Sequence, residues 1–383
     1  KNCKLLNKRK TVREFVALSL IKLLGSRRIY NLLEQVEHPQ DVFRMGIEDL
    51  KKVDKVGDAT AKAIAKFNQW QEVDKIIEKT EKYGARIITL EDDDYPPLLR
   101  KIHDPPIMLW KLGSSQALTR PSIAIVGTRR PTRYGKKQAG RFAGFAVESG
   151  ISVVSGLAHG IDTEAHATTL KQKGTTVAVL GSGIDVIYPA ANRSLARSII
   201  HSGGAIISEY PPGTSPESGH FPVRNRIVSG MTMGTLVVES GLEGGSMITA
   251  SSALDQGREV FVIPHSLDNN AGIGCNAILK RGHGKLVQKG EDMWNELYQF
   301  CSFESDAGEE VPENDSEVEK NWKNWNLSRT ATRICTLLET GSMHIDRLAE
   351  HIPASSGELM SELLSLEMQG CIQQRPGRVF ELS

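Results

Sequence analysis

The stretch SIAIVGTRRPTRYGKK, Ser122–Lys137, decides the fold. It starts as a run of apolar, β-branched residues typical of a buried strand, and the run stops at Gly127. Five cations then follow within eleven positions: Arg129, Arg130, Arg133, Lys136 and Lys137. In α/β proteins, a strand that ends in a glycine turn before a helix binds anions. The stretch therefore predicts an anion site for a nucleotide, a dinucleotide or a nucleic-acid backbone.

Strand-like and helix-like segments alternate from Ser122 to about Val287. We predict strands at 122–126, 151–154, 176–180, 205–207, 235–238 and 259–263. We predict helices that begin near Gly135, Asp162, Arg193, Met247 and Gly272. This alternation indicates an α/β domain with a doubly wound, mostly parallel sheet.

We predict four parts of the chain: a small helical domain over 1–83, an α/β core over 84–300, an acidic linker over 301–327 and a winged-helix-like domain over 328–383. Residues 84–120 are rich in proline and acid, which favours an extended connector at the start of the core. Residues 303–320 hold eight acids and one lysine, a composition typical of disorder. Ser328 could cap a helix to Glu339, further helices are expected near His344 and Ser356, and a hairpin is expected around Pro376-Gly377.

In the first part, Leu50–Phe67 resembles a helix–hairpin–helix, whose hairpin amides can hold a DNA phosphate. Gly57 supplies one hairpin glycine, but Lys55 stands where the other is usual. Residues 23–33 could form a degenerate partner hairpin. DNA contact and a purely structural helical module both remain open for this part.

Composition is that of an ordinary globular protein, with 39% hydrophobic and 24% charged residues. No segment has the length of a membrane span and no signal peptide is recognisable, so we expect a cytoplasmic protein. The five cysteines form no C-x-x-C pair, which makes a zinc or redox motif unlikely. The net charge of +1 is unevenly spread, because residues 121–290 hold 17 Lys and Arg against 11 Asp and Glu. The centre of the chain is therefore the expected polyanion surface.

Three common motifs are absent. No G-x-G-x-x-G follows the first strand, because Gly127 is followed by Thr128-Arg129-Arg130. Gly135-Lys136 lacks the upstream glycine of a P-loop, and no G-x-S-x-G occurs. These absences argue against a dinucleotide site, a P-loop and a serine nucleophile elbow, and we expect no cofactor.

The segment SGLAHGIDTEAH, residues 155–166, allows two interpretations. His159, Asp162 and His166 could bind a metal. Alternatively, the glycines form a tight turn, Asp162 caps a helix and His166 packs against the sheet. The structural interpretation is favoured, because one turn rarely supplies a complete ligand set.

The segment FPVRNRIVSG, residues 221–230, places an aromatic residue beside two arginines, and we predict a binding loop. Phe221 could stack on a base while Arg224 and Arg226 grip phosphates. A salt-bridged loop with a buried Phe221 is the alternative. The glycines that follow successive strands, Gly127, Gly156, Gly181 and Gly241, should converge on one edge of the sheet. Lys280 could line the same groove.

Together these segments, with LGSGIDVIYPAANR, SEYPPG and GREVFVIP in the same order, resemble the DprA/Smf family. The resemblance covers about residues 85–290. It implies an extended Rossmann-like domain that binds single-stranded DNA, forms homodimers and loads a RecA-type recombinase during natural transformation and recombination. It implies no enzymatic activity.

The resemblance also implies the DNA-binding positions. They fall on Gly127, Thr128 and Arg129, on Phe221, Arg224, Asn225 and Arg226, and on the glycine-rich loops around Gly156, Gly181 and Gly245. The chain departs from the family pattern at two places. Ala190-Ala191 replace a basic residue, for which Arg193 could substitute, and His265 replaces a glycine.

Two other functions compete with DNA binding by the core. Related folds cleave nucleoside monophosphates with a glutamate beside a glycine-rich turn, and Glu239 could be that group. A sequence-specific regulator would use the winged helix, but its third helix carries Glu358, Glu362 and Glu367 and no Lys or Arg. An acidic helix repels phosphates, so this module is interpreted as a protein contact. The best match for the basic turn is the phosphodiester backbone of single-stranded DNA.

Overall fold

The computed structural model describes residues 12–304, 327–339, 341–352, 356–368, 371–375 and 379–382. By its internal contacts, the chain divides into two units, Lys1–Gly308 and Glu309–Ser383. The first unit contains a small helical module and the α/β core, and the second contains the C-terminal module.

A nine-stranded sheet organises the first unit, in the order β1-β2-β6-β5-β4-β3-β7-β8-β9. The strands from β6 to β9 along this order all run parallel, which confirms the predicted doubly wound, Rossmann-like core. Their bounds are β3 (Ser122–Val126), β4 (Ser152–Ser155), β5 (Thr176–Leu180), β6 (Ala205–Ser208), β7 (Gly234–Val237), β8 (Glu259–Val262) and β9 (Lys285–Leu286). The chain builds outward from β3 to β6 and then returns to β7 on the other side of β3. The switch point between β3 and β7 is where such sheets bind ligands.

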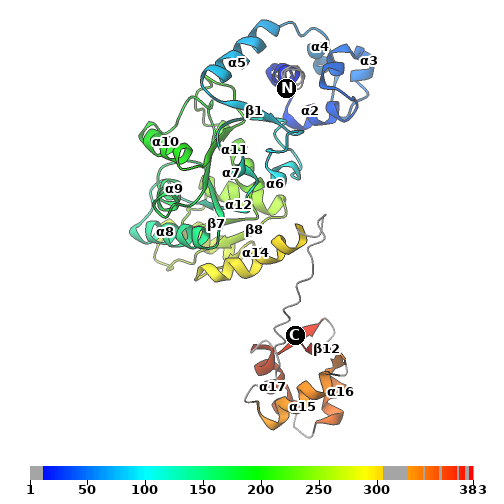
Figure 1. Ribbon diagram of the computed structural model, residues 1–383, viewed down its shortest axis with the longest axis vertical. Coiled ribbons are helices and arrows are strands. Elements are labelled where there is room, and N and C mark those ends of the chain that lie inside the picture. Colours follow the sequence, from blue (N-terminus) through cyan, green and yellow to red (C-terminus); the bar gives the residue numbers. More distant parts are fainter. Residues whose placement is uncertain are drawn as a thin grey trace. The chain divides into compact units, whose positions relative to one another are not determined.

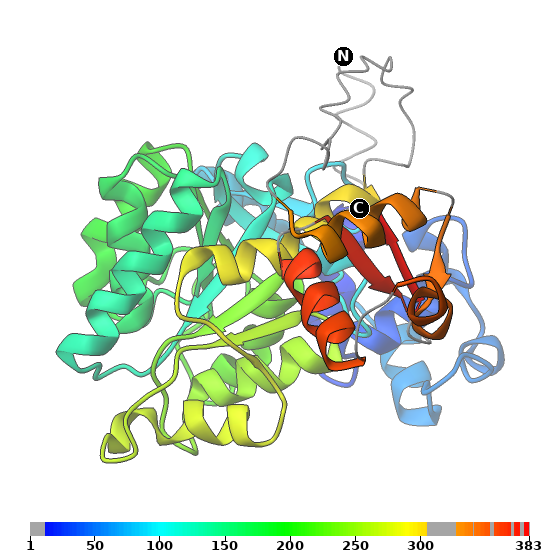
Figure 2. The same ribbon diagram turned by 90° about the horizontal axis from the view of Figure 1, so that it is seen from below.

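Helices cover both faces of this sheet (Figures 1 and 2). Side chains alternate along β3, so Ile123 and Ile125 pack on one face while Ala124 and Val126 pack on the other. The first face is covered by α8 (Arg133–Glu148), α9 (Ile161–Lys171), α10 (Arg193–His201) and α14 (Gly290–Glu304). The second is covered by α11 (His220–Gly230), α12 (Gly245–Asp255) and α13 (Ile273–Lys280).

Two segments differ from their predicted structure. Residues 221–230, predicted as a loop, form most of α11. The predicted connector contains β1 (Arg86–Thr89), α6 (Pro97–Arg100), β2 (Met108–Gly113) and α7 (Gln116–Thr119). β2 pairs antiparallel with β6 and buries Trp110 completely, and Pro97 opens α6 where its missing N–H costs nothing.

The helical module precedes the sheet. It contains a helix over residues 12–20, then α2 (Ser26–Leu33), the 3₁₀ turn η1 (Pro39–Arg44), α3 (Ile47–Leu50), α4 (Asp58–Ala65) and α5 (Trp70–Lys82). Its buried leucines belong to the same hydrophobic cluster as Trp110 of the sheet. The hairpin between α3 and α4 is present, and Lys55 adopts the left-handed backbone (φ 64°) that a glycine usually supplies there.

The C-terminal unit is a winged helix. It contains α15 (Arg329–Leu338), β10 (Met343–His344), α16 (Ile345–His351), α17 (Ser356–Met368), β11 (Ile372–Arg375) and β12 (Val379–Leu382). Ser328 caps α15 as expected, since its Oγ accepts a hydrogen bond from the Ala331 amide at 3.0 Å. β12 pairs with both β10 and β11. The predicted turn at Pro376-Gly377 lies outside the described residues.

α14 runs through Glu304, so the first residues of the predicted acidic linker are helical. The rest of that linker, up to residue 326, lies outside the described residues. Within the described part of the chain, the helices are all too short or too polar to cross a bilayer.

Candidate nucleic-acid interface

A pocket of about 360 Å³ lies at the switch point of the sheet. Its walls come from the turn after β3, the turn after β4, the loop between β7 and α12, and one side of α11. The lining residues are Val126–Arg130, Gly156, Ala158, Asp162, Phe221, Arg224, Asn225, Val228, Ser240, Gly241, Gly244–Ser246 and Thr249. Loops far apart in the sequence therefore converge on one edge, as the parallel topology requires.

The turn after β3 presents its cations to solvent because a buried acid anchors its backbone. The Thr128 amide donates to the Glu239 carbonyl oxygen at 2.7 Å. The Glu239 carboxylate accepts hydrogen bonds from the Thr132 amide and Oγ1, both at 2.7 Å, at the start of α8. Arg129 and Arg130 are exposed, and neither forms an ion pair with a described acid. Their charge is therefore available to a ligand.

The amino end of α12 forms the opposite wall. Gly244 is the N-cap residue and contributes no side-chain hydrogen bond to the helix. Gly245 and Ser246 follow it and line the pocket. The first amides of a helix carry partial positive charge, so this wall favours an anion.

Arg224 joins α11 to the turn after β4 and to the end of β5 inside the protein. Only 5% of the residue is exposed, and its Nη1 donates to the Gly156 carbonyl oxygen at 2.8 Å and to the Val179 carbonyl oxygen. Its Nε donates to Asn225 Oδ1 at 3.2 Å, and Asn225 Nδ2 donates to the Gly245 carbonyl oxygen at 3.0 Å. Burial lowers the pKa of Arg224 to about 10, so the guanidinium stays charged at neutral pH.

Phe221 forms an aromatic face at the rim of the pocket. The Arg129 guanidinium lies 5.5 Å from its ring centroid, and the Tyr188 ring lies 5.8 Å away at an interplanar angle of 42°. A side chain at Gly181 would stand 2.9 Å from the Phe221 ring, so only glycine allows this approach. Phe221 is half-buried and Tyr188 is exposed, which leaves ring surface for a ligand.

Asp162 and His166 have structural partners. Asp162 is buried in the first turn of α9, and its Oδ2 accepts the Gly156 and Ala158 amides at 3.1 and 3.3 Å. It therefore fixes the turn before α9. His166 is fully buried with Nδ1 2.7 Å from Thr176 Oγ1, and burial lowers its pKa to about 3. No set of three possible metal ligands comes together among the described residues.

Two family models match the chain: DNA recombination-mediator protein A over residues 86–298 and the DprA winged helix domain over residues 325–378. The chain belongs to the DprA family. This confirms the resemblance, and the match includes every loop that builds the pocket.

Curated DprA-family relatives extend over most of the chain. Protein Smf from Synechocystis sp. is 31% identical over 331 residues, which are 80% of this chain and 82% of the relative. An X-ray structure of DNA processing protein A from Streptococcus pneumoniae has a TM-score of 0.65 at 33% identity and covers 75% of this chain and 98% of that one. A structure of the Helicobacter pylori protein, described by its single-stranded DNA binding mode, has a TM-score of 0.50 at 30% identity and covers 56% of this chain and 97% of that one.

The pocket brings together eight of the twelve DNA-binding residues predicted from the sequence and the DprA resemblance: Gly127, Thr128, Arg129, Gly156, Phe221, Arg224, Asn225 and Gly245. The other four do not line it. Gly181 lies beneath Phe221, and Arg193 is exposed at the first residue of α10. Arg226 faces the opposite side of α11, and Lys280 ends α13, about two turns from the carboxyl edge.

The predicted DNA-binding positions of the DprA core did not include Arg130, although it belongs to the basic turn that predicted an anion site, and the sequence interpretation missed Tyr188. Tyr188 stands in DVIYPAAN, between a strand and a helix, so its place after β5 was a usable signal. The departure at His265 is accommodated locally. The His265 ring packs against Gly272, and a Cβ on residue 272 would stand 2.1 Å from that ring. The Nε2 atom of His265 is 2.8 Å from the Val238 carbonyl oxygen.

Proposed function

We propose that this protein binds single-stranded DNA in the switch-point pocket and acts as a recombination mediator. The observation that supports this proposal best is that cations without an ion pair and an accessible aromatic ring lie together at the carboxyl edge of the sheet. Arg129 and Arg130 stand beside Phe221, opposite the uncapped amino end of α12. Cations and helix amides bind phosphates, and aromatic faces stack on any base, so this set suits a strand held without sequence preference.

A second hollow extends the basic edge. It has a volume of about 390 Å³ and shares Arg129 and Arg130 with the pocket. Lys136 and His159 also line it, together with one acid, Glu164. A DNA strand that leaves the switch-point pocket toward this hollow would pass the further positive charge of Lys136.

Arg224 has a positioning role in this proposal. Its guanidinium donates hydrogen bonds to carbonyl oxygens inside the protein. Arg224 therefore shapes the pocket, and its buried charge adds positive potential to the pocket. Arg226 is paired with Asp104 and Glu209, at 3.2 and 2.6 Å. The direct phosphate contacts therefore fall to the cations of the turn after β3.

The enzymatic alternative finds less support. Glu239 is fully buried, both its carboxylate oxygens accept hydrogen bonds from Thr132, and it does not line the pocket. Asp162 is the remaining lining acid, and two amides occupy one of its oxygens. We accordingly propose a binding protein without catalytic activity.

We also propose that the protein forms a homodimer, loads a RecA-type recombinase and works in the cytoplasm. Membership of the DprA family supports the recombinase partner. Exposed apolar residues near the carboxyl edge support the dimer, because Leu267 is 94% exposed, Leu242 55% and Ile273 45%. Sedimentation equilibrium of the wild type and of Leu267→Asp would test the dimer, and a monomeric wild type would reject it.

The decisive experiment compares single-stranded and duplex oligonucleotides by fluorescence anisotropy across a salt series. We expect tighter binding of the single strand and an affinity that falls with salt. Incubation with nucleoside monophosphates should release no free base. Equal affinity for both DNA forms, or base release, would contradict the proposal.

A further inference from the structure

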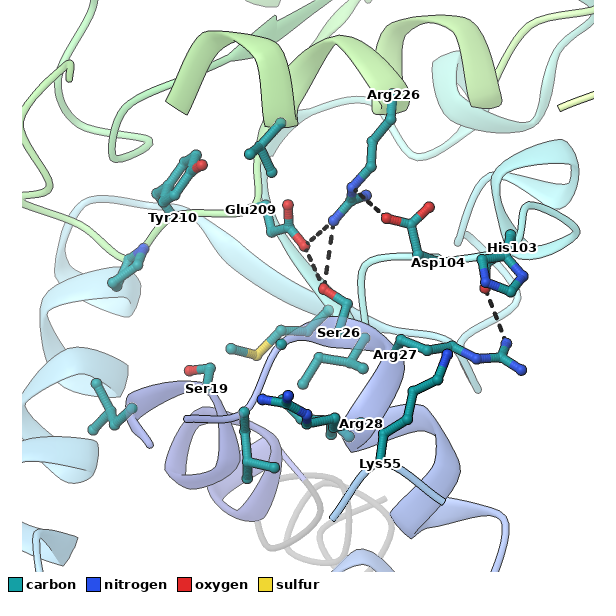
Figure 3. Close-up of a pocket in the computed structure, with 18 residues that line it drawn as sticks. Ser19, Ser26, Arg27, Arg28, Lys55, His103, Asp104, Glu209, Tyr210 and Arg226 are labelled. Atoms are coloured by element: carbon teal, nitrogen blue, oxygen red, sulfur yellow. Dashed lines mark hydrogen bonds and ion pairs between the residues drawn. The ribbon is translucent and has the colours of Figure 1, made fainter. Parts of the chain in front are cut away.

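A larger pocket, of about 640 Å³, lies where the helical module meets the α/β core. Figure 3 shows Arg226 reaching down from α11 on one side and Ser26, Arg27, Arg28 and Lys55 rising from the helical module on the other. Two hairpins contribute to this wall. Gly25 and Ser26 begin α2, and Lys55 belongs to the hairpin that leads into α4.

The charges in this junction pocket do not cancel. Its two acids are both committed to Arg226: Asp104 lies 3.2 Å from Nε and Glu209 lies 2.6 Å from Nη2. Ser26 Oγ also donates to Glu209, at 3.0 Å. Arg27 Nη1 donates to the His103 carbonyl oxygen at 3.0 Å and Arg28 Nη1 to the Leu23 carbonyl oxygen at 2.6 Å. These two exposed or half-buried arginines and Lys55 have no ion pair with any described acid, so their positive charge is not neutralised.

Two guanidinium nitrogens in the junction pocket are buried and lack a hydrogen-bond acceptor among the described residues. They are Arg27 Nε and Arg226 Nη1. Buried donors are normally paired, so unpaired ones on facing walls indicate a missing acceptor. The first turn of α2 adds amides without a side-chain cap. A phosphate in the pocket would offer acceptors to the guanidinium groups and amides that line it.

α11 separates the junction pocket from the switch-point pocket. Phe221, Arg224 and Asn225 face the switch-point pocket, whereas Val223 and Arg226 face the junction pocket. Phe221 and Arg226 are five residues apart, which is about 8 Å along the helix axis. A strand held at Phe221 therefore needs to pass only the amino end of α11 to reach the second pocket.

Aromatic side chains lie near the amino end of α11, where the strand would pass from one pocket to the other. The Tyr210 and His220 rings are stacked, with centroids 4.1 Å apart at an angle of 26°, and Tyr210 lines the junction pocket. Tyr188 contacts Phe221 on the other side of the crossing. Val223 lines the junction pocket and is 44% exposed. Aromatic faces along a basic path are the usual means of holding unpaired bases.

We propose that the strand bound at Phe221 continues around the amino end of α11 and places its next phosphates in the junction pocket. Arg27, Arg28 and Lys55 bind them there. The helical module is thus a second DNA contact, and single-stranded DNA is its ligand. This inference rests on the proposed function, because it extends the same strand.

The test uses the full chain with Lys55→Gly and Arg28→Ala, singly and together. Glycine accepts the left-handed backbone of residue 55, so Lys55→Gly removes the charge and keeps the hairpin. Lys66→Ala is the matched control, because Lys66 is exposed at the far end of α4. Binding is measured on oligothymidylates of about 6 and about 20 nucleotides, within and beyond a single-domain site size, and on a duplex.

For the longer strand, each lost phosphate contact should weaken binding about fivefold at 0.1 M salt and flatten the log K against log salt slope by about 0.7. The short strand and the Lys66→Ala control should keep wild-type affinity, and thermal melting should stay unchanged.

Wild-type affinity of the double variant for the longer strand would overturn the inference and leave the proposed function intact. An equal loss on the short strand would also overturn it, because the residues would then act through the first pocket. A loss confined to the duplex would assign the pocket to double-helical DNA instead. A wild type that binds neither strand would reject the proposed function itself.

Discussion

Arg129 and Phe221 lie side by side at the rim of the switch-point pocket, and we expect them to hold DNA by different forces. The arginine is exposed and unpaired, so its contribution is electrostatic and depends on salt. The phenylalanine offers a ring face, so its contribution is stacking and nearly independent of salt. Salt dependence therefore separates the two roles.

Arg129→Ala should weaken single-strand binding for every sequence and flatten the log K against log salt slope by about 0.7. Phe221→Ala should cost about 1–3 kcal/mol of binding free energy and leave that slope nearly unchanged. Anisotropy titrations at four salt concentrations measure both. Folded variants with wild-type affinity and slope would remove these residues from the interface.

Residue types at this edge were largely predictable, because glycines and cations after strands are visible in the sequence. The groups that each of these side chains contacts in the folded protein were not predictable. Arg224 and Arg129 look alike in sequence, yet Arg224 is buried under the pocket and Arg129 is free. Burial depends on the carbonyl oxygens of Gly156 and Val179, which only the folded sheet brings to Arg224.

At the scale of elements, α11 is a core helix that the sequence interpretation predicted as a loop. Its buried positions include Arg224, Asn225 and Ser229, so polar residues interrupt the apolar stripe that indicates a helix. Gly219 precedes it and provides no side-chain cap. Hydrogen bonds to neighbouring elements satisfy these polar groups, and such tertiary contacts leave no periodic signal in the sequence. The strands from β3 to β8 were predictable because their apolar runs are continuous.

Arg224 joins α11 to the ends of β4 and β5, so its loss should loosen three elements together. We expect Arg224→Ala to lower the free energy of unfolding by about 2–5 kcal/mol, because buried acceptors lose a charged donor. Arg130→Ala, at an exposed position, should change it by less than about 0.5 kcal/mol. Urea unfolding followed by circular dichroism compares them. An Arg224→Ala variant of wild-type stability that has lost DNA binding would instead make Arg224 a direct DNA contact.

At the scale of the whole molecule, the winged helix forms a unit separate from the one that carries both pockets. Residues 328–383 hold five arginines and seven acids, so this module is a poor partner for a polyanion. Its helices and hairpin were predictable because Ser328, the apolar spacing and the Pro-Gly pair are local signals. The hairpin of the helical module was harder to predict from the sequence, because Lys55 occupies a position at which such hairpins usually have a glycine.

Removal of residues 321–383 should leave single-strand affinity within about twofold of the intact chain, because the cations of both pockets precede residue 290. The remaining chain should melt at the temperature of the core transition in the full protein. A loss of tenfold or more, about 1.4 kcal/mol, would show that the winged helix contacts DNA or supports the binding form.

The position of α11 between two unlike pockets has a consequence for orientation. The switch-point pocket offers Phe221 and the amino end of α12, whereas the junction pocket offers cations from the two hairpins. A strand that crosses from one to the other meets a different surface at each end, so its 5′ and 3′ directions are not equivalent. The bound DNA should therefore have a fixed polarity. A dye quenched at only one terminus of the oligonucleotide would reveal it.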